Sequence, residues 1–173
     1  LGESIYISGS GTCFGRLSAE SFAAIDLEGK LIKENSNRLS ANKISPSKEY
    51  PIHLMIYQQY ENVRAVIHTH SFYSTLWSCL PDINPDDALP SITPYLQMKV
   101  GKIALVPYAR PGSEELFDFM RSRLQAGDGF LLANHGPVIA GSSILDAFYG
   151  IEELEESARI AWHLRAEKFN LIR

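Results

Sequence analysis

Apolar positions recur along the chain with two different periods, and the two periods predict which segments are strands and which are helices. Alternation of apolar and polar residues predicts a strand at residues 3–8, and residues 22–27 and 30–33 flank Glu28 and Gly29 as the arms of a hairpin. Short runs rich in Val, Ile and Leu predict further buried strands. These runs lie at residues 63–69, 103–106, 130–133 and 138–140.

Helical spacing of apolar residues appears in the segments between those strands. Ser47 is a good N-cap for a helix carrying Ile52, Met55 and Ile56, and Ser113 is followed by two glutamates that suit the positive end of a helix. Residues 71–80 and 143–169 also have helical periodicity. Helices and strand pairs are interleaved along residues 1–173, so the sequence predicts one layered α/β domain, more antiparallel than a doubly wound fold.

Composition narrows the class of protein. The 173 residues carry a formal net charge of −4, which excludes the basic footprint of a nucleic-acid-binding or membrane-surface protein. No apolar run approaches the length of a membrane span, and the first residues lack a basic region and an apolar core, so no signal peptide is predicted. Since Leu1 stands where a methionine would begin a chain, we expect an N-terminal part to be missing. Cys13 and Cys79 have no CxxC spacing, which favours reduced thiols and a cytoplasmic location.

Three histidines carry the first candidate chemistry. His68 and His70 stand two residues apart at the end of a predicted strand, so both side chains point to the same face. His135 lies in an Asn-His-Gly segment between two other strands. Three neutral imidazoles and one open or carboxylate position are the ligand set of a catalytic zinc site. The alternative is that these histidines make ordinary hydrogen bonds.

Glu49 is the second candidate, because it lies in the predicted first helical turn after Ser47 and Lys48. A carboxylate at that place is favoured by the helix dipole alone, so capping explains it as well as catalysis does. The free N–H groups of the same turn, with Ser47 and Lys48, are suited to binding an anion.

The order of motifs resembles that of the class II aldolase and adducin family. The resemblance runs from about Ile5 to Leu164, and it rests on residues 46–49, 65–70, 106–113, 131–141 and 152–156. It implies a three-layer α/β/α fold with a central mixed, mostly antiparallel sheet. It also implies that His68, His70 and His135 bind a divalent metal, usually zinc, and that Glu49 is both a further ligand and the acid/base group. Three histidines and a carboxylate also suit Mn²⁺, Fe²⁺ or Co²⁺.

Within the family, Lys48 and residues 84–90, 98–102 and 106–112 resemble the 3-oxo-tetronate 4-phosphate decarboxylases. Such enzymes release CO₂ from a four-carbon 3-keto acid phosphate and form dihydroxyacetone phosphate. A divalent cation stabilises the resulting enediolate as a Lewis acid, and an acid such as Glu49 then protonates it. A sugar-phosphate aldolase or epimerase (a fuculose-phosphate aldolase, for example) and a catalytically inactive adducin-like interaction module are the alternatives, because fold alone does not define function.

The resemblance also implies where the substrate binds and how the chain assembles. Ser10, Gly11, Ser47 and Lys48 match the family's phosphate segments, although residues 8–11 also read as an ordinary flexible loop, and Lys48 could instead contact the substrate carboxylate. A further Gly-Asn phosphate segment, expected before the first strand, is absent. Tyr95 matches a tyrosine that reaches a neighbouring subunit, as a catalytic group or as an interface aromatic. The implied assembly is a homotetramer with active sites near subunit interfaces.

Overall fold

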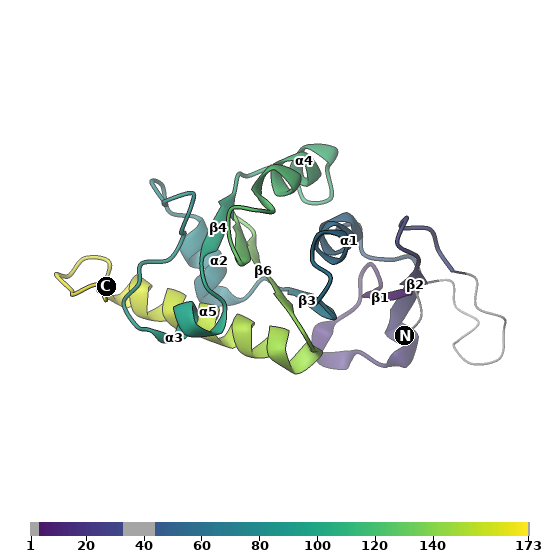
Figure 1. Ribbon diagram of the computed structural model, residues 1–173, viewed down its shortest axis with the longest axis horizontal. Coiled ribbons are helices and arrows are strands. Elements are labelled where there is room, and N and C mark those ends of the chain that lie inside the picture. Colours follow the sequence, from purple (N-terminus) through teal and green to yellow (C-terminus); the bar gives the residue numbers. More distant parts are fainter. Residues whose placement is uncertain (1–3, 33–43, 173) are drawn as a thin grey trace. The chain divides into compact units, whose positions relative to one another are not determined.

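The structure is a computed structural model that describes residues 4–32 and 44–172 (Figure 1). Its chain forms two compact units, residues 1–58 and residues 59–173. That residues 1–173 form a single domain stays a prediction. Among the described residues, no helix has both the length and the apolar character needed to cross a membrane.

The first unit is built around a two-stranded antiparallel sheet of β1 (Ile5–Ser8) and β2 (Phe22–Ile25), in which Ile5 pairs with Ile25. The short 3₁₀ helices η1 (Phe14–Arg16) and η2 (Ala19–Ser21) connect the two strands, and α1 (Tyr50–Gln59) follows. Alternation places one face of each strand inward, as the sequence predicts. The resulting small core contains Ile5, Ile7, Ala23 and Ile25, with Ile44, Tyr50, Leu54 and Tyr57 packed against it.

The predicted hairpin after β2 forms as far as Ile32, the last described residue of its second arm. Gly29 has a φ of 78°, which suits the tight turn. Leu31 forms an antiparallel bridge with Ile25, and the Ile32 N–H donates to the Ala24 carbonyl oxygen. The Asp26 carboxylate accepts the N–H groups of Glu28 and Lys30 and closes the turn locally. Lys33, at the end of the predicted arm, lies outside the described residues.

The second unit contains a four-stranded sheet in the order β3–β6–β5–β4. β6 (Gly136–Gly141) pairs antiparallel with β3 (Ala65–His68) and with β5 (Gly129–Leu132), whereas β4 (Ile103–Val106) runs parallel to β5. This confirms an α/β fold with a mixed, mostly antiparallel sheet. β1 and β2 of the first unit form a separate two-stranded sheet.

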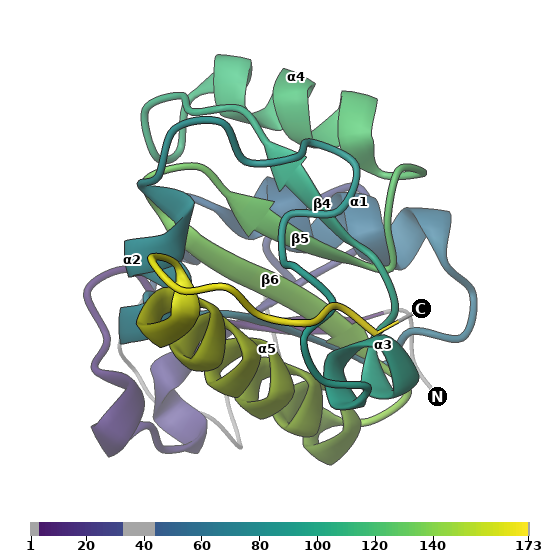
Figure 2. The ribbon, with the colours of Figure 1, turned by 90° about the vertical axis from the view of Figure 1, so that its left-hand side faces the viewer.

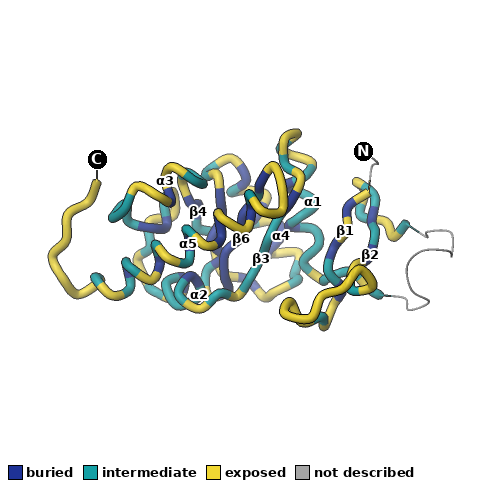
Figure 3. The backbone as a smooth tube through the Cα atoms, turned by 90° about the horizontal axis from the view of Figure 1, so that it is seen from below, coloured by how far each residue is buried: buried dark blue, intermediate teal, exposed yellow. Residues whose placement is uncertain are grey.

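Helices cover the four-stranded sheet. α5 (Ile144–Leu164) packs on β6 and β3, and α2 (Phe72–Ser78) and α3 (Tyr95–Lys99) pack on α5. α4 (Glu114–Arg123) packs at β4, and Figure 2 shows α4 and α5 on opposite sides of the strands. The core between α5 and the sheet includes Ile103, Leu131, Ile139, Leu154 and Ala158. In Figure 3 the backbone of β6 is buried, whereas the chain after α5 is exposed.

One predicted helix boundary was wrong, and one short helix was not predicted. α5 ends at Leu164 and not near residue 169. α3 was not predicted, because its five residues follow a proline-rich segment and are too few to show a helical period. The N-caps at Ser113 and Ser143 both accept a backbone N–H three residues further on.

Candidate metal centre and anion pocket

The three predicted histidines meet at one edge of the four-stranded sheet. His68 ends β3 and pairs with Val138, and Leu132 ends β5 and pairs with Gly136, so both strands end beside the beginning of β6. His70 follows β3 by two residues, and His135 occupies the turn between β5 and β6. His135 is buried, His68 is half-buried and His70 is exposed, so this histidine cluster (His68, His70 and His135) is open to solvent on the His70 side.

The side chains of the histidine cluster direct their Nε2 atoms toward one another. The Nε2 atom of His135 lies 3.3 Å from that of His68 and 3.1 Å from that of His70. The ring centroids are 4.8 to 5.2 Å apart. Tetrahedral zinc binds imidazole nitrogens at roughly 2.0–2.1 Å, which separates two ligand nitrogens by about 3.3 Å. The spacing therefore fits nitrogen ligands of a common divalent cation.

A backbone carbonyl fixes the tautomer of His68. Its Nδ1 atom lies 2.9 Å from the carbonyl oxygen of Pro137. A carbonyl oxygen can only accept, so Nδ1 carries the hydrogen and donates it, and in the neutral ring Nε2 presents its lone pair to the cluster. This is the supporting hydrogen bond that metal-binding histidines usually make through their second nitrogen.

The backbone of residues 134–136 brings His135 close to the end of β3. Asn134 has a φ of 55° and Gly136 a φ of 157°. A Cβ at Gly136 would lie 2.2 Å from the Thr69 carbonyl oxygen, closer than any side chain allows. Glycine at position 136 therefore permits the contact between the β5–β6 turn and the segment that carries His70.

α2 holds the same turn from another side. The Thr75 hydroxyl donates to the His135 carbonyl oxygen over 3.1 Å, and the Asn134 N–H donates to the Ser78 carbonyl oxygen over the same distance. Sequence reasoning missed both contacts. Polar residues inside a predicted helix were the available signal, but the sequence does not show which turn they face.

Glu49 lies just before α1. The Ser47 hydroxyl accepts the Glu49 N–H over 3.3 Å, as an N-cap side chain does, and the Glu49 carbonyl accepts from Ile52. The regular helix begins at Tyr50, two residues later than an N-cap at Ser47 predicts, so Glu49 precedes the first turn that was predicted to contain it. This difference is within the usual variation of helix ends. Glu49 belongs to the first unit and the histidines to the second, so its coordination of the same cation stays a proposal.

The two predicted phosphate segments lie side by side in the first unit. The Ser10 N–H donates to Ser45, the Ser47 N–H donates to Ser8, and Gly9 forms an antiparallel bridge with Pro46. Residues 8–12 and 44–48 thus form one paired structure, even though more than 30 residues separate them in sequence. Gly11, with a φ of 78°, makes the turn at the end of the first segment.

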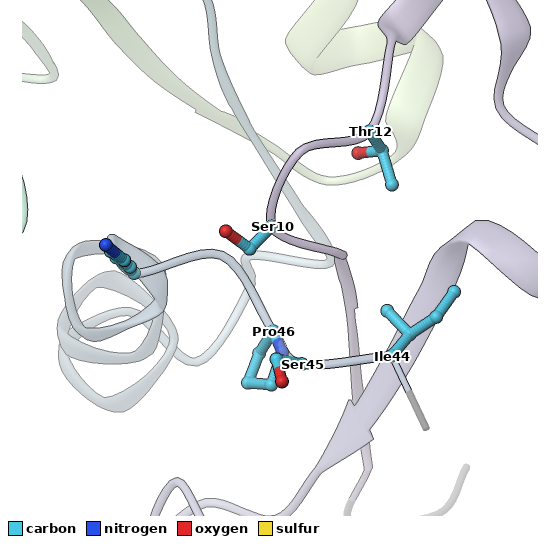
Figure 4. A pocket seen from close by; sticks show the side chains of 6 residues that line it. Ser10, Thr12, Ile44, Ser45 and Pro46 are labelled. Atoms are coloured by element: carbon cyan, nitrogen blue, oxygen red, sulfur yellow. The ribbon is translucent and has the colours of Figure 1, made fainter. Parts of the chain in front are cut away.

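A hollow of about 620 Å³ opens where these segments meet (Figure 4). We call it the anion pocket. Its lining contains two of the predicted residues, Ser10 and Lys48, while Gly11 and Ser47 stand next to lining residues in the chain. Among the described residues of the lining, Lys48 alone is charged, and it contributes a positive charge to the pocket. The lining is completed by Thr12, Ile44, Ser45 and Pro46, which sequence reasoning did not select.

Tyr95 is the first residue of α3, and 60% of its surface is exposed. α3 is tied to α5 by an ion pair between Lys99 and Asp146. Hydrogen bonds from Lys99 and then from Ser142 lower the pKa of Asp146 from 3.8 to about 2. Tyr95 therefore lies exposed on a helix that is bonded to α5, and its catalytic role stays a prediction.

An α/β unit that gathers three imidazoles at the edge of a sheet has the donor set of a divalent-metal protein. The family then follows from comparison with known sequences. Residues 2–162 match the class II aldolase and adducin N-terminal domain, and the chain belongs to that family. The resemblance inferred from the motifs is confirmed.

Relatives with assigned names agree with this placement. The chain is 39% identical to a 3-oxo-tetronate 4-phosphate decarboxylase of Haemophilus influenzae, over 97% of this chain and 76% of the relative. It is 37% identical to an L-fuculose phosphate aldolase of Methanococcus maripaludis, over 92% of this chain and 79% of that protein. The crystal structure of YgbL from Klebsiella pneumoniae, described as an aldolase, epimerase or decarboxylase, superposes with a TM-score of 0.88 at 33% identity. That superposition covers 99% of this chain and 78% of YgbL.

Proposed function

We propose that this protein is a metal-dependent carbon–carbon lyase that decarboxylates a 3-oxo-tetronate 4-phosphate to dihydroxyacetone phosphate and CO₂. The observation that carries the proposal is the convergence of three imidazole Nε2 atoms, two pairs of them 3.1 and 3.3 Å apart. Similarity to named decarboxylases over nearly the whole chain supports the choice of reaction.

His68, His70 and His135 are the proposed nitrogen ligands of the cation, and Glu49 is the proposed oxygen ligand. Zn²⁺ fits three imidazoles and a carboxylate, and Mn²⁺, Fe²⁺ or Co²⁺ would also be accepted by this donor set. The exposed side of the cluster, at His70, leaves room for a substrate to approach.

The proposed reaction breaks the bond between C1 and C2 of the 3-keto acid. The electron pair of that bond remains at C2 and is delocalised onto the C3 oxygen, and C1 leaves as CO₂. A bound divalent cation supplies Lewis-acid stabilisation of the negative charge that develops on the substrate oxygens. Glu49, as the proposed acid, then delivers a proton to C2, and Tyr95 is the proposed second proton-handling group.

The anion pocket is the proposed phosphate site. Ser10, Gly11, Ser47 and Lys48 are the proposed binding residues, with Lys48 providing the positive charge. We prefer phosphate to carboxylate as the Lys48 partner, because a cation that stabilised the carboxylate ground state would oppose its loss as CO₂. The proximity of the two segments supports this assignment.

We further propose a cytoplasmic homotetramer. Its two cysteines are free and exposed, as in a reducing compartment. α3 and the beginning of α5 expose several large apolar side chains, a feature of surfaces that bind another subunit. These are Tyr95, Met98, Ile144, Leu145, Phe148 and Tyr149.

Product analysis tests the reaction. The purified protein with Zn²⁺ or Mn²⁺ is expected to release CO₂ from a 3-oxo-tetronate 4-phosphate in stoichiometric amount with dihydroxyacetone phosphate. Release of an aldehyde from a ketose 1-phosphate, without CO₂ from the keto acid, would instead establish the aldolase alternative, which the similarity to L-fuculose phosphate aldolases supports.

A metal assay addresses the inactive adducin-like alternative. Protein purified without chelators is expected to contain about one divalent cation per chain. Absence of metal, together with absence of both activities, would contradict the lyase proposal and favour an interaction module.

A further inference from the structure

A carboxylate from α5 takes the place of an N-cap for α2. Glu155 Oε1 accepts the Tyr73 N–H over 2.7 Å, and Glu155 Oε2 accepts the Ser74 N–H over 2.9 Å and the Ser74 hydroxyl over 2.6 Å. Ser71, the N-cap of α2 by position, makes no capping bond with its own side chain. The first turn of α2 is therefore anchored by a residue more than 80 positions away in sequence.

The anchored helix is connected to two of the candidate ligands. α2 begins two residues after His70, and from its next turn Thr75 donates to the carbonyl oxygen of His135. The last turn of α2 accepts the Asn134 N–H at Ser78. The position of α2 thus affects the histidine that precedes it and the turn that carries the buried histidine.

We propose that Glu155 is a positioning residue for the candidate metal centre, acting through α2 and Thr75 on His70 and His135. This inference rests on the proposed function, because it requires the histidine cluster to bind a cation. It goes beyond that function because it assigns a role to Glu155, a residue of α5 that is not itself a proposed metal ligand.

The charge of Glu155 agrees with this role. Burial raises the pKa of its carboxyl group, but hydrogen bonds from Ser74, Tyr73 and Ser71 outweigh burial and bring the pKa below its ordinary value. Glu155 is therefore ionised at neutral pH, and two backbone N–H groups and a hydroxyl are held by a charged acceptor, which is stronger than a neutral one.

The test compares Glu155→Gln with Glu156→Gln. Both substitutions remove one negative charge from neighbouring positions of α5, but Glu156 is exposed and pairs with Arg159 on the same helix. Metal-free protein is titrated with Co²⁺ at a temperature well below the melting point of each variant, and the visible absorption of bound Co²⁺ reports the geometry of its ligands. Glu155→Gln is expected to raise the Co²⁺ dissociation constant by about 10–100-fold, as loss of an outer-sphere support does, and to alter the spectrum. Glu156→Gln is expected to leave both unchanged.

Thr75→Val supplies a second test, which remains informative even if Glu155→Gln does not fold. It removes the hydroxyl that holds the His135 carbonyl and keeps the shape of the side chain. It is expected to weaken Co²⁺ binding as well. Because Glu155 and Thr75 act in one series of contacts, the double variant is expected to lose less affinity than the product of the single losses.

Three outcomes would overturn the inference, and they are distinguishable. A lower melting temperature of Glu155→Gln with unchanged Co²⁺ affinity and spectrum would show that Glu155 only stabilises α2. If the loss of Co²⁺ affinity in the double variant equals the product of the two single losses, Glu155 does not act through Thr75. Failure of the wild-type protein to bind Co²⁺ at all would contradict the proposed metal site itself, and this inference with it.

Discussion

The histidine cluster and the anion pocket place their functional groups by different means. In the histidine cluster, the backbone that carries the side chains is fixed by the four-stranded sheet, by the close approach of Gly136 to Thr69 and by the hydrogen bond from Thr75. His135 is also buried. The pocket depends on two loops whose backbones pair with each other, and its functional side chains Ser10 and Lys48 are exposed. Metal ligands must be placed to within tenths of an ångström, whereas a lysine can follow an anion on a flexible stem. The two regions should therefore respond differently to substitution.

Removing a ligand should have the largest effect. His135→Ala is expected to lower metal affinity by more than the roughly 100-fold that loss of a supporting residue can cause, and to abolish turnover, because one of three nitrogens is lost. Glu49→Gln is expected to abolish turnover as well, since an amide cannot donate the required proton. Metal titration and a CO₂ assay measure these effects. The exposed His163 provides a matched control in His163→Ala, and turnover near the wild-type level in either site variant would contradict the assigned roles.

Glycine substitutions should separate the two regions next. Gly136→Ala places a Cβ against the Thr69 carbonyl and is expected to cost about 3 kcal/mol of unfolding free energy, in the range of steric overpacking. Gly11→Ala meets no atom within 4 Å and is expected to cost only about 1 kcal/mol, from its positive φ. Urea unfolding measures both. Equal losses would show that the turn carrying His135 is less constrained than the structure indicates.

Neutralising the anion pocket should change substrate binding and not metal binding. A hydrogen bond to a charged partner contributes about 1.5–3 kcal/mol, so Lys48→Ala is expected to raise KM for the phosphorylated substrate by roughly 10–100-fold. Lys30→Ala, at an exposed position of the same unit, serves as the control. A Lys48→Ala variant that loses Zn²⁺ affinity, or whose KM is unchanged, would contradict the division of roles.

The smallest expected effect concerns the pH dependence of the α3–α5 contact. Asp146 has a pKa of about 2 in the folded protein, below its ordinary value of 3.8. Its stabilisation is therefore fully present above about pH 4 and is lost as the pH falls toward 2. Melting curves of the wild type and of Asp146→Asn should differ more at pH 5 than at pH 2.5. A difference that is independent of pH would argue against the ion pair with Lys99.

Much of this structure could be predicted, because the relevant signals are local. Strand alternation predicted that His68 and His70 share one face. The two glutamates after Ser113 and the helical period after Ser143 predicted the starts of α4 and α5. The backbone pairing of Ser10 with Ser45 was not predicted. The resemblance implied only that residues 10–11 and 47–48 both bind phosphate.

The remaining features depend on contacts between distant residues. The strand order places β6 between β3 and β5, and this order brings the turn that carries His135 beside the end of β3, where His68 lies. The hydrogen bonds of Glu155 to the first turn of α2 have no local sequence signal, and neither does the steric requirement for glycine at position 136. Each depends on a residue that is distant in sequence, Tyr73 in the first case and Thr69 in the second. α3 has too few residues for a periodic pattern and is held by Lys99 and Asp146 instead.

X-ray absorption spectroscopy of the metal-loaded protein tests the central claim most directly. The proposed site predicts about one Zn²⁺ per chain, with three imidazole nitrogens at roughly 2.0–2.1 Å and one or two oxygen ligands. A spectrum with fewer than three imidazoles, or a zinc sphere that His135→Ala leaves unchanged, would contradict the claim that these histidines hold one cation.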